Sequence, residues 1–138
     1  MGQSTDAILF YGYCWTDEGS PPWRDEDEDE DEDDRYVRLA GFDEEWTSGD
    51  DGYFKRKAKV LAKATGKIVR HCSGDCTMYG VAVKGTVMRA WRGDPQEIDP
   101  AKMNPKPEWA EDLRVYCEHM GIDPGDQKPA WHLVSWWC

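Results

Sequence analysis

The side chains that could do chemistry are few in this sequence, and the cysteines and histidines come first. Cys72 and Cys76 are four residues apart, a spacing found among zinc ligands, and Cys117 with His119 would complete a set of three cysteines and one histidine. Cys117 and His119 fall in a helical pattern, where side chains two positions apart point about 200° away from each other. They cannot share one ion, so the sequence predicts no metal site and no cofactor.

The same thiols leave a redox pair as an alternative. Cys72 and Cys76 flank a turn and would face each other across a hairpin. The chain has five cysteines, and an odd number argues against a complete disulfide framework. We expect reduced thiols, with Cys117 as ordinary core, Cys14 as strand filler and Cys138 at an exposed terminus.

Nucleophilic catalysis finds little support in the pattern of residues. His71 and Cys72 are neighbours on a predicted strand, so their side chains point to opposite faces. There is no Gly-x-Ser-x-Gly motif and no phosphate-binding glycine loop. The sequence therefore carries no signature that demands an enzyme. A small nucleotide-binding protein or enzyme that uses a sheet face and loop residues such as His71, Asp75 and Glu97 remains the alternative.

Ten consecutive carboxylates are the most distinctive feature of the chain, whose formal net charge is −11. The acidic segment consists of Asp25, Glu26, Asp27, Glu28, Asp29, Glu30, Asp31, Glu32, Asp33 and Asp34. In an extended chain its charges recur about every 3.3 Å, comparable to the phosphates of one nucleic-acid strand. The segment could thus imitate a nucleic acid and bind a basic groove on another protein. It could also be a solvated loop that serves only solubility, since blocks of like charge usually are. Metal binding by it would be weak and unselective.

A basic stretch follows the acidic segment. Seven Lys or Arg and no acid lie between Tyr53 and Arg70. Its candidate binding face on a predicted helix consists of Lys55, Arg56, Lys59 and Lys63. The stretch could pair with the chain's own acidic segment and hold it down, or it could simply be solvated. We do not expect direct binding of nucleic acid, because a chain of this net charge would be repelled by it.

The helices and strands that position these groups are predicted from the spacing of apolar residues and from Gly and Pro residues that end each element. Strands are predicted at 7–15, 67–71 and 131–137, and 78–91 is either one long strand or two short ones with a bulge at Gly85. Helices are predicted at 35–40, 50–65 and 108–120. Trp109, Leu113, Tyr116, Cys117 and Met120 mark the core face of the last helix. The order strand, helices, two strands, helix, strand predicts an α+β fold, a ferredoxin-like split βαβ sandwich. The acidic segment is then a loop insertion at 16–34, after the first strand.

Aromatic residues near the end of the chain are a further candidate surface. Trp136 and Trp137 would face opposite sides of the last strand, so at least one should be core. The other could pack under a helix or form part of an exposed aromatic patch for a partner. Together with Trp131 and Tyr11 it could also make an aromatic sheet face that resembles a stacking platform.

The bulk composition places limits on the class of protein. The length of 138 residues fits one domain. No stretch approaches the roughly 20 apolar residues of a membrane span, so we expect no membrane association. The N-terminal residues lack the basic and apolar regions of a secretion signal, which favours a cytoplasmic protein.

Four segments of the chain are distinctive: MGQSTDAILFYGYCW at the start, HCSGDCTMYGVAV in the middle, RGDPQEI after it and WHLVSWW at the end. In these segments the chain resembles a family of small uncharacterised actinobacteriophage proteins. The resemblance implies a phage accessory protein in a bacterial cytoplasm, and it carries over no catalytic residue. We therefore expect a non-enzymatic protein that binds a host protein with a basic surface through the acidic segment, and so inhibits or redirects it.

Overall fold

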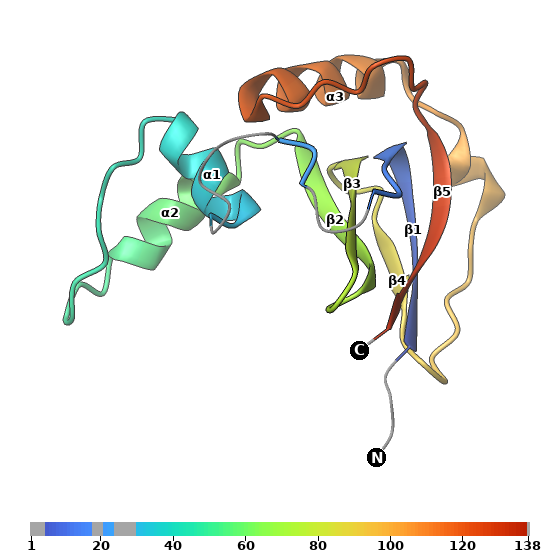
Figure 1. The fold of residues 1–138 in the computed structure, drawn as a ribbon, viewed down its shortest axis with the longest axis horizontal. Coiled ribbons are helices and arrows are strands. Elements are labelled where there is room, and N and C mark those ends of the chain that lie inside the picture. The colour runs from blue at the N-terminus through green and yellow to red at the C-terminus, as the bar shows by residue number, and fades with distance from the viewer. Residues whose placement is uncertain (1–4, 18–20, 24–29, 138) are drawn as a thin grey trace.

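The structure is a computed structural model that describes residues 5–17, 21–23 and 30–137. Over these ranges the chain is α+β, as the sequence predicts (Figure 1). The strands are β1 (Thr5–Cys14), β2 (Gly66–Ser73), β3 (Thr77–Val83), β4 (Met88–Ala90) and β5 (Ala130–Trp137). The helices are α1 (Glu32–Leu39), α2 (Tyr53–Leu61), the 3₁₀ helix η1 (Pro100–Met103) and α3 (Pro107–Met120).

The five strands form one mixed sheet, which is so strongly curved that its strand pairings make a closed circuit. β1 lies antiparallel to β5 from Thr5 to Gly12, and on its other edge it pairs first with β4 and then with β3. β2 pairs antiparallel with β3 and meets β5 in parallel only at Cys72 and Ser73. The pairings therefore run in a circuit from β1 to β3, β2, β5 and back to β1.

Two glycines allow β1 and β3 to approach closely inside this curve. A Cβ atom on Gly12, whose φ is 157°, would lie 1.8 Å from the carbonyl oxygen of Val81. A Cβ atom on Gly80 would lie 2.6 Å from the ring of Phe10. Any larger side chain at either position would push the strands apart, so the curvature depends on glycine at this crossing.

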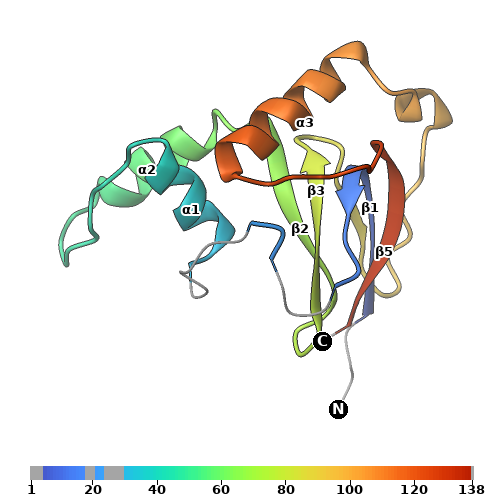
Figure 2. The ribbon, with the colours of Figure 1, turned by 45° about the horizontal axis from the view of Figure 1, so that its top comes forward.

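The main core lies between the sheet and α3. α3 runs across one end of the strands and contacts β2 and β3 (Figure 2). Leu113, Tyr116, Cys117 and Met120 are buried there, which confirms the predicted core face of this helix. Trp109 is half-buried at the margin. We call this side of the sheet the helix-covered face.

Trp23 completes the helix-covered face from an unexpected place in the sequence. It lies within the predicted acidic insertion, yet its side chain is buried and packs edge-on against Tyr79 at 5.7 Å between ring centroids. Its backbone forms an isolated bridge with Ile122, just beyond α3. The connection between β1 and α1 is thus anchored to the core at Trp23, which the sequence prediction missed.

The opposite side of the sheet carries a smaller core. Ile8, Phe10, Val69 and Ala82 are buried on it, with Trp136 partly buried beside them. α3 lies on the other side, where it contacts β2 and β3 and where its Trp109 also meets Tyr11 of β1 and Trp131 of β5. We call this second side the inner face, because the sheet curves around it.

α1 and α2 project to one side of the sheet, and α1 is docked on the end of α3 (Figure 1). The buried guanidinium of Arg35 donates from Nε to the carbonyl oxygen of Met120 at 3.0 Å. His119 Nε2 lies 3.0 Å from the carbonyl oxygen of Tyr36, whose ring stacks on Tyr116. These contacts hold the start of α1 in a defined place relative to the sheet.

Several predicted boundaries are wrong. α1 begins at Glu32, not at residue 35, because the Asp31 side chain caps it by accepting from the backbone N–H of Asp34 at 2.8 Å. The predicted loop at 16–34 therefore ends too late. α2 is shorter than predicted and buries no side chain, and Phe54 is 62% exposed. Of the two alternatives for 78–91, the structure has two strands, β3 and β4, with a turn at Gly85 between them.

Candidate functional site

The acidic segment is only partly described by the structure. Asp25, Glu26, Asp27, Glu28 and Asp29 lie outside the described residues. The other half is built into α1: Asp31 is its N-cap, and Glu32, Asp33 and Asp34 form its first turn, where carboxylates interact favourably with the helix dipole. Burial and the neighbouring carboxylates Glu32 and Asp31 raise the pKa of Asp33.

Three carboxylates of this half pair with basic residues of the same chain. Glu30 accepts two hydrogen bonds from Arg38, at 2.7 and 2.9 Å. Asp34 forms an ion pair with Lys57 on α2. Glu32 accepts from Arg70 on β2, at 2.6 Å to Nη2 and 3.3 Å to Nε. The alternative in which the basic stretch holds the acidic segment is thus realised for Lys57 and Arg70.

The predicted basic face of α2 is not the surface that makes these contacts. Lys55, Arg56 and Lys59 are exposed on α2, and Lys63 is exposed in the turn that follows it. Arg56 pairs with Glu44 and Asp50, in the loop before the helix, and not with a described carboxylate of the acidic segment. The neighbouring Lys57, which faces α1, makes the contact instead.

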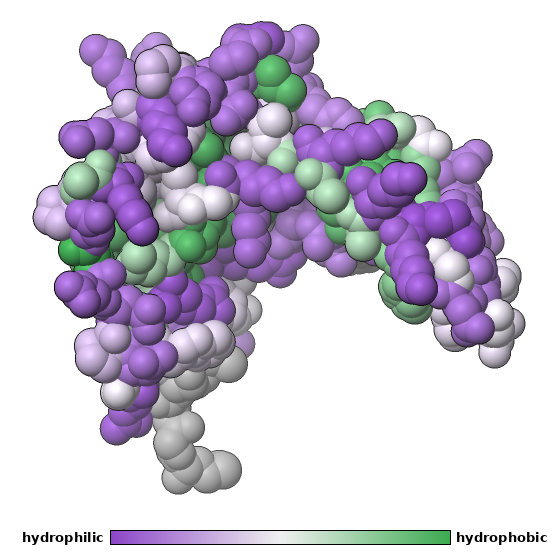
Figure 3. Space-filling view, turned by 180° about the vertical axis from the view of Figure 1, so that it is seen from behind, coloured by the Kyte–Doolittle hydropathy of each residue, from purple (hydrophilic) through white to green (hydrophobic). Residues whose placement is uncertain are grey.

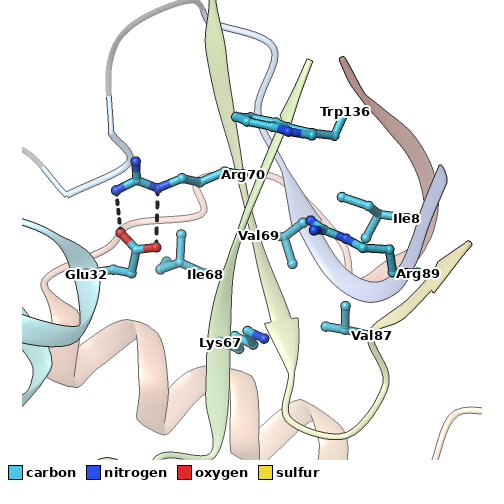
Figure 4. A pocket seen from close by; sticks show the side chains of 9 residues that line it. All are labelled: Ile8, Glu32, Lys67, Ile68, Val69, Arg70, Val87, Arg89 and Trp136. Carbon is cyan, nitrogen blue, oxygen red and sulfur yellow. Dashed lines mark hydrogen bonds and ion pairs between the residues drawn. The ribbon is translucent and has the colours of Figure 1, made fainter. Parts of the chain in front are cut away.

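A cavity of about 610 Å³ lies at the mouth of the inner face (Figure 4). It is larger than two others, of about 250 and 200 Å³, that border α1 and η1. Its lining residues are Ile8, Glu32, Lys67, Ile68, Val69, Arg70, Val87, Arg89 and Trp136. The molecule is visibly hollowed between the sheet and the α1–α2 pair, with apolar side chains showing there (Figure 3).

The cavity exists because β2 has an open edge. β2 pairs with β5 only at Cys72 and Ser73, so the preceding residues Lys67–Arg70 have no strand partner there among the described elements. Cys72 has a φ of 73°, a conformation unusual for a residue with a side chain, and marks the junction. Across the gap, the other wall comes from β1, β4 and β5.

Cations, one aromatic ring and an apolar floor define the chemistry of this cavity. Lys67, Arg70 and Arg89 line it with exposed side chains. Ile8 and Val69 form a buried floor, and Figure 4 shows Trp136 on one side of the cavity and Lys67 on the opposite side. Such a combination is suited to a ligand with a planar ring and a negative charge.

Asp6 stands behind Arg89. Its side chain is 2% exposed, and Oδ2 lies 3.8 Å from Arg89 Nη1, beyond hydrogen-bond distance. Oδ1 has no hydrogen-bond partner among the described residues. Asp6 is directly opposite Trp136, and Arg89 directly opposite Ile8, so these side chains share the inner face. The buried carboxylate attracts the guanidinium of Arg89 toward the cavity.

A contact between Cys14 and His71 was not predicted, because the two residues are 57 positions apart. Cys14 Sγ lies 3.3 Å from His71 Nε2, and the same nitrogen lies 3.1 Å from the carbonyl oxygen of Trp15. Burial raises the pKa of Cys14 and lowers that of His71, so both are neutral near pH 7. These two contacts make His71 a structural link between β2 and the end of β1.

The remaining predicted residues lie apart from one another. Cys14, Cys72, Cys76 and Cys117 are free thiols, and burial raises the pKa of Cys117 to about 11. Among the described residues, no group of three or more His, Cys, Asp or Glu is placed to hold a metal ion.

The residues named for the nucleotide-binding alternative are also dispersed. His71 is buried on β2, Asp75 is exposed in the β2–β3 turn, and Glu97 lines the cavity beside η1. Of the sequence-based candidates for such a site, Trp136 is the one at the large cavity. Lys67, Arg70 and Arg89 gave no sequence signal that separates them from other surface cations.

Comparisons with protein-family models, with curated proteins and with solved structures find no match to this chain. In the described part of the chain, every helix is too short or too polar to cross a membrane.

Proposed function

We propose that this chain is a small binding protein whose ligand is a planar organic anion of the nucleotide class, held in the cavity at the mouth of the inner face. The observation that carries the proposal is that Lys67, Arg89 and Trp136 line one cavity over the apolar floor of Ile8 and Val69. The volume of about 610 Å³ lies within the range of about 300–1,000 Å³ that is usual for small-molecule sites.

Each part of such a ligand has a complementary group. The planar base would pack against Trp136, since bases and indole rings stack through their faces. The phosphate would lie toward Lys67 and Arg89, which offer one ammonium and one guanidinium group. No acid–base pair or nucleophile lines the cavity in an arrangement that suggests turnover, so the activity proposed is binding.

Calorimetric titration with adenosine 5′-monophosphate, adenosine and inorganic phosphate tests the proposal. We expect the nucleotide to bind more tightly than either fragment. Stacking of a base contributes about 1–3 kcal/mol, so Trp136→Leu should weaken binding by roughly 5- to 150-fold. Arg89→Gln should lower the affinity for the nucleotide and leave the affinity for adenosine unchanged.

Two matched variants control for general effects. Trp46→Leu removes an indole that is 56% exposed in the loop between α1 and α2. Arg114→Gln removes an exposed guanidinium on α3. Neither should change the affinity. The proposal is wrong if no nucleotide saturates the protein at millimolar concentration, or if Trp46→Leu weakens binding as much as Trp136→Leu.

The acidic segment supports a second candidate function, the binding of a host protein with a basic surface. Ten uninterrupted carboxylates would accelerate association with such a surface and make it strongly dependent on salt. The internal ion pairs of Glu30, Glu32 and Asp34 reduce the charge available in the described half. This function therefore depends mainly on the other half of the segment.

A pull-down from bacterial lysate separates this candidate from one in which the segment serves only solubility. The intact protein is compared with a variant in which residues 25–29 are replaced by a Gly/Ser linker, which leaves the residues of α1 unchanged. Partners captured by the intact protein alone, and lost in 500 mM NaCl, would support it. The same partners with both proteins would count against it.

We also propose a relation to a known fold and a biological role, both of which the sequence suggested. A relation to the ferredoxin-like sandwich is supported by the order of the elements and by the pairing of the first strand with the last. β4 and the junction of β2 with β5 would be additions to that fold. A role as a phage accessory protein in a bacterial cytoplasm rests on the resemblance of the four sequence segments.

A further inference from the structure

Arg70 differs from Arg89 because a carboxylate already accepts hydrogen bonds from it, whereas Asp6 lies 3.8 Å from Arg89, beyond hydrogen-bond distance. The Arg70 side chain turns away from Arg89 and Trp136 toward α1, where it meets Glu32 (Figure 4). The contact is two-pronged, from Nη2 to Oε2 at 2.6 Å and from Nε to Oε1 at 3.3 Å. Arginine uses the same two-pronged geometry to bind phosphate.

The surroundings hold the Arg70 guanidinium in place for an anion. The group lies 5.7 Å from the centre of the Tyr79 ring, and Tyr79 is itself buried in the helix-covered face. Glu32 comes to it as the first residue of α1, which the hydrogen bond from Arg35 to the end of α3 fixes in position. A carboxylate of the acidic segment therefore fills an anion position at the rim of the cavity.

This internal pair can be displaced. The side chains of Arg70 and Glu32 are 43% and 21% exposed, and ion pairs that water reaches are weak. A phosphate group carries more negative charge than a carboxylate and offers the same two-pronged acceptor. Glu32 would move a short way toward solvent when the phosphate takes its place.

We propose that Arg70 is a second anion subsite of the cavity and that Glu32 competes for it from within the chain. This inference rests on the proposed function, since it assumes a ligand in the cavity. The two anion positions lie on different sides of the β2 edge, with Lys67 and Arg89 at one and Arg70 at the other. The preferred ligand would then be a nucleotide with a chain of phosphates, long enough to reach both.

Titrations with adenosine 5′-monophosphate and adenosine 5′-triphosphate, without divalent metal, test the inference on the wild type, on each of two single variants and on their double variant. In Glu32→Gln we expect the triphosphate to bind about two- to fivefold more tightly, the effect of removing one exposed ion-pair competitor. The monophosphate should not gain. In Arg70→Gln the triphosphate should lose affinity and the monophosphate should not, and adding Glu32→Gln should then have no further effect.

Glu30→Gln is the matched control, because it removes the same charge from the same segment but pairs with Arg38 outside the cavity lining. Equal gains in Glu30→Gln and Glu32→Gln would show a general charge effect and overturn the inference. A wild-type protein that binds the monophosphate through Trp136, with Glu32→Gln unchanged, would overturn only this inference. A wild-type protein that binds neither nucleotide would overturn the proposed function as well.

Discussion

The two faces of the sheet are built from the same strands, but one is covered by a helix and the other has a cavity at its edge. Among the described residues, the helix-covered face buries ten apolar side chains, including Trp23, Leu113 and Met120, and α3 covers them. The described part of the inner face buries four apolar side chains and the carboxylate of Asp6, and the face opens between β2 and the strands opposite. Cations and an indole stand at that opening where a second layer would otherwise lie.

This difference separates stability from binding within one small domain. Burial of apolar surface stabilises the fold, so the helix-covered face contributes most of the stability. The inner face keeps polar groups that are exposed to water, and these groups are available to bind a ligand. Substitutions on the two faces should therefore affect different measurements.

The largest expected effect is on the helix-covered face. Trp23→Ala removes a buried indole and should lower the free energy of unfolding by about 3–5 kcal/mol, as for other large-to-small core changes. The same substitution at the half-buried Trp136 should cost about 1 kcal/mol. Urea denaturation followed by circular dichroism measures both. Equal losses would mean that the two faces contribute alike, which would break the comparison.

The next largest effect concerns the hydrogen bond that holds α1 on the end of α3. Arg35→Met leaves the Met120 carbonyl without its charged donor, and we expect a loss of about 1.5–3 kcal/mol. Arg114→Met, on an exposed ion pair of α3, should change stability by less than about 0.5 kcal/mol. Unfolding in urea is the measurement. Loss of protection from hydrogen exchange confined to α1 would show which contact was broken.

The smallest effect distinguishes the inner face by its response to pH. Burial lowers the pKa of His71 below its usual value of 6.5, so the unfolded chain takes up a proton more readily than the folded one. Stability contributed by the neutral imidazole is thus present above pH 6.5 and declines as the pH falls through that value. We expect the unfolding free energy to fall less between pH 7 and pH 5.5 in His71→Gln than in the wild type. An identical fall in both proteins would contradict this.

Local patterns in the sequence predicted much of the fold. α3 was predicted almost to the residue, because its apolar spacing is helical and Gly121 ends it in the left-handed conformation with a φ of 72°. β1 and β5 follow from continuous apolar runs. α2 was predicted too long, since its amphipathic pattern has no core to face and the helix buries no side chain. The start of α1 was missed because a run of carboxylates predicts a solvated loop more strongly than a capped helix.

The candidate site was far less accessible to sequence reasoning. Glu32 and Arg70 are 38 positions apart, and Cys14 and His71 are 57 apart. Nothing in the neighbourhood of either member indicates its partner, since such pairs form only when the strands close. Trp136 was noted as a possible stacking residue, but the cations around it could not be selected from seventeen Lys and Arg.

The sequence by itself determined the charge of the chain, the identity of most helices and strands, and the apolar face of α3, because these depend on residues within one or two turns of each other. The tertiary structure alone decided that β2 leaves an edge open, that Trp23 belongs to the core and that Glu32 reaches Arg70. These outcomes depend on how far the sheet curves, and that curvature is set by close contacts between strands that lie far apart along the chain.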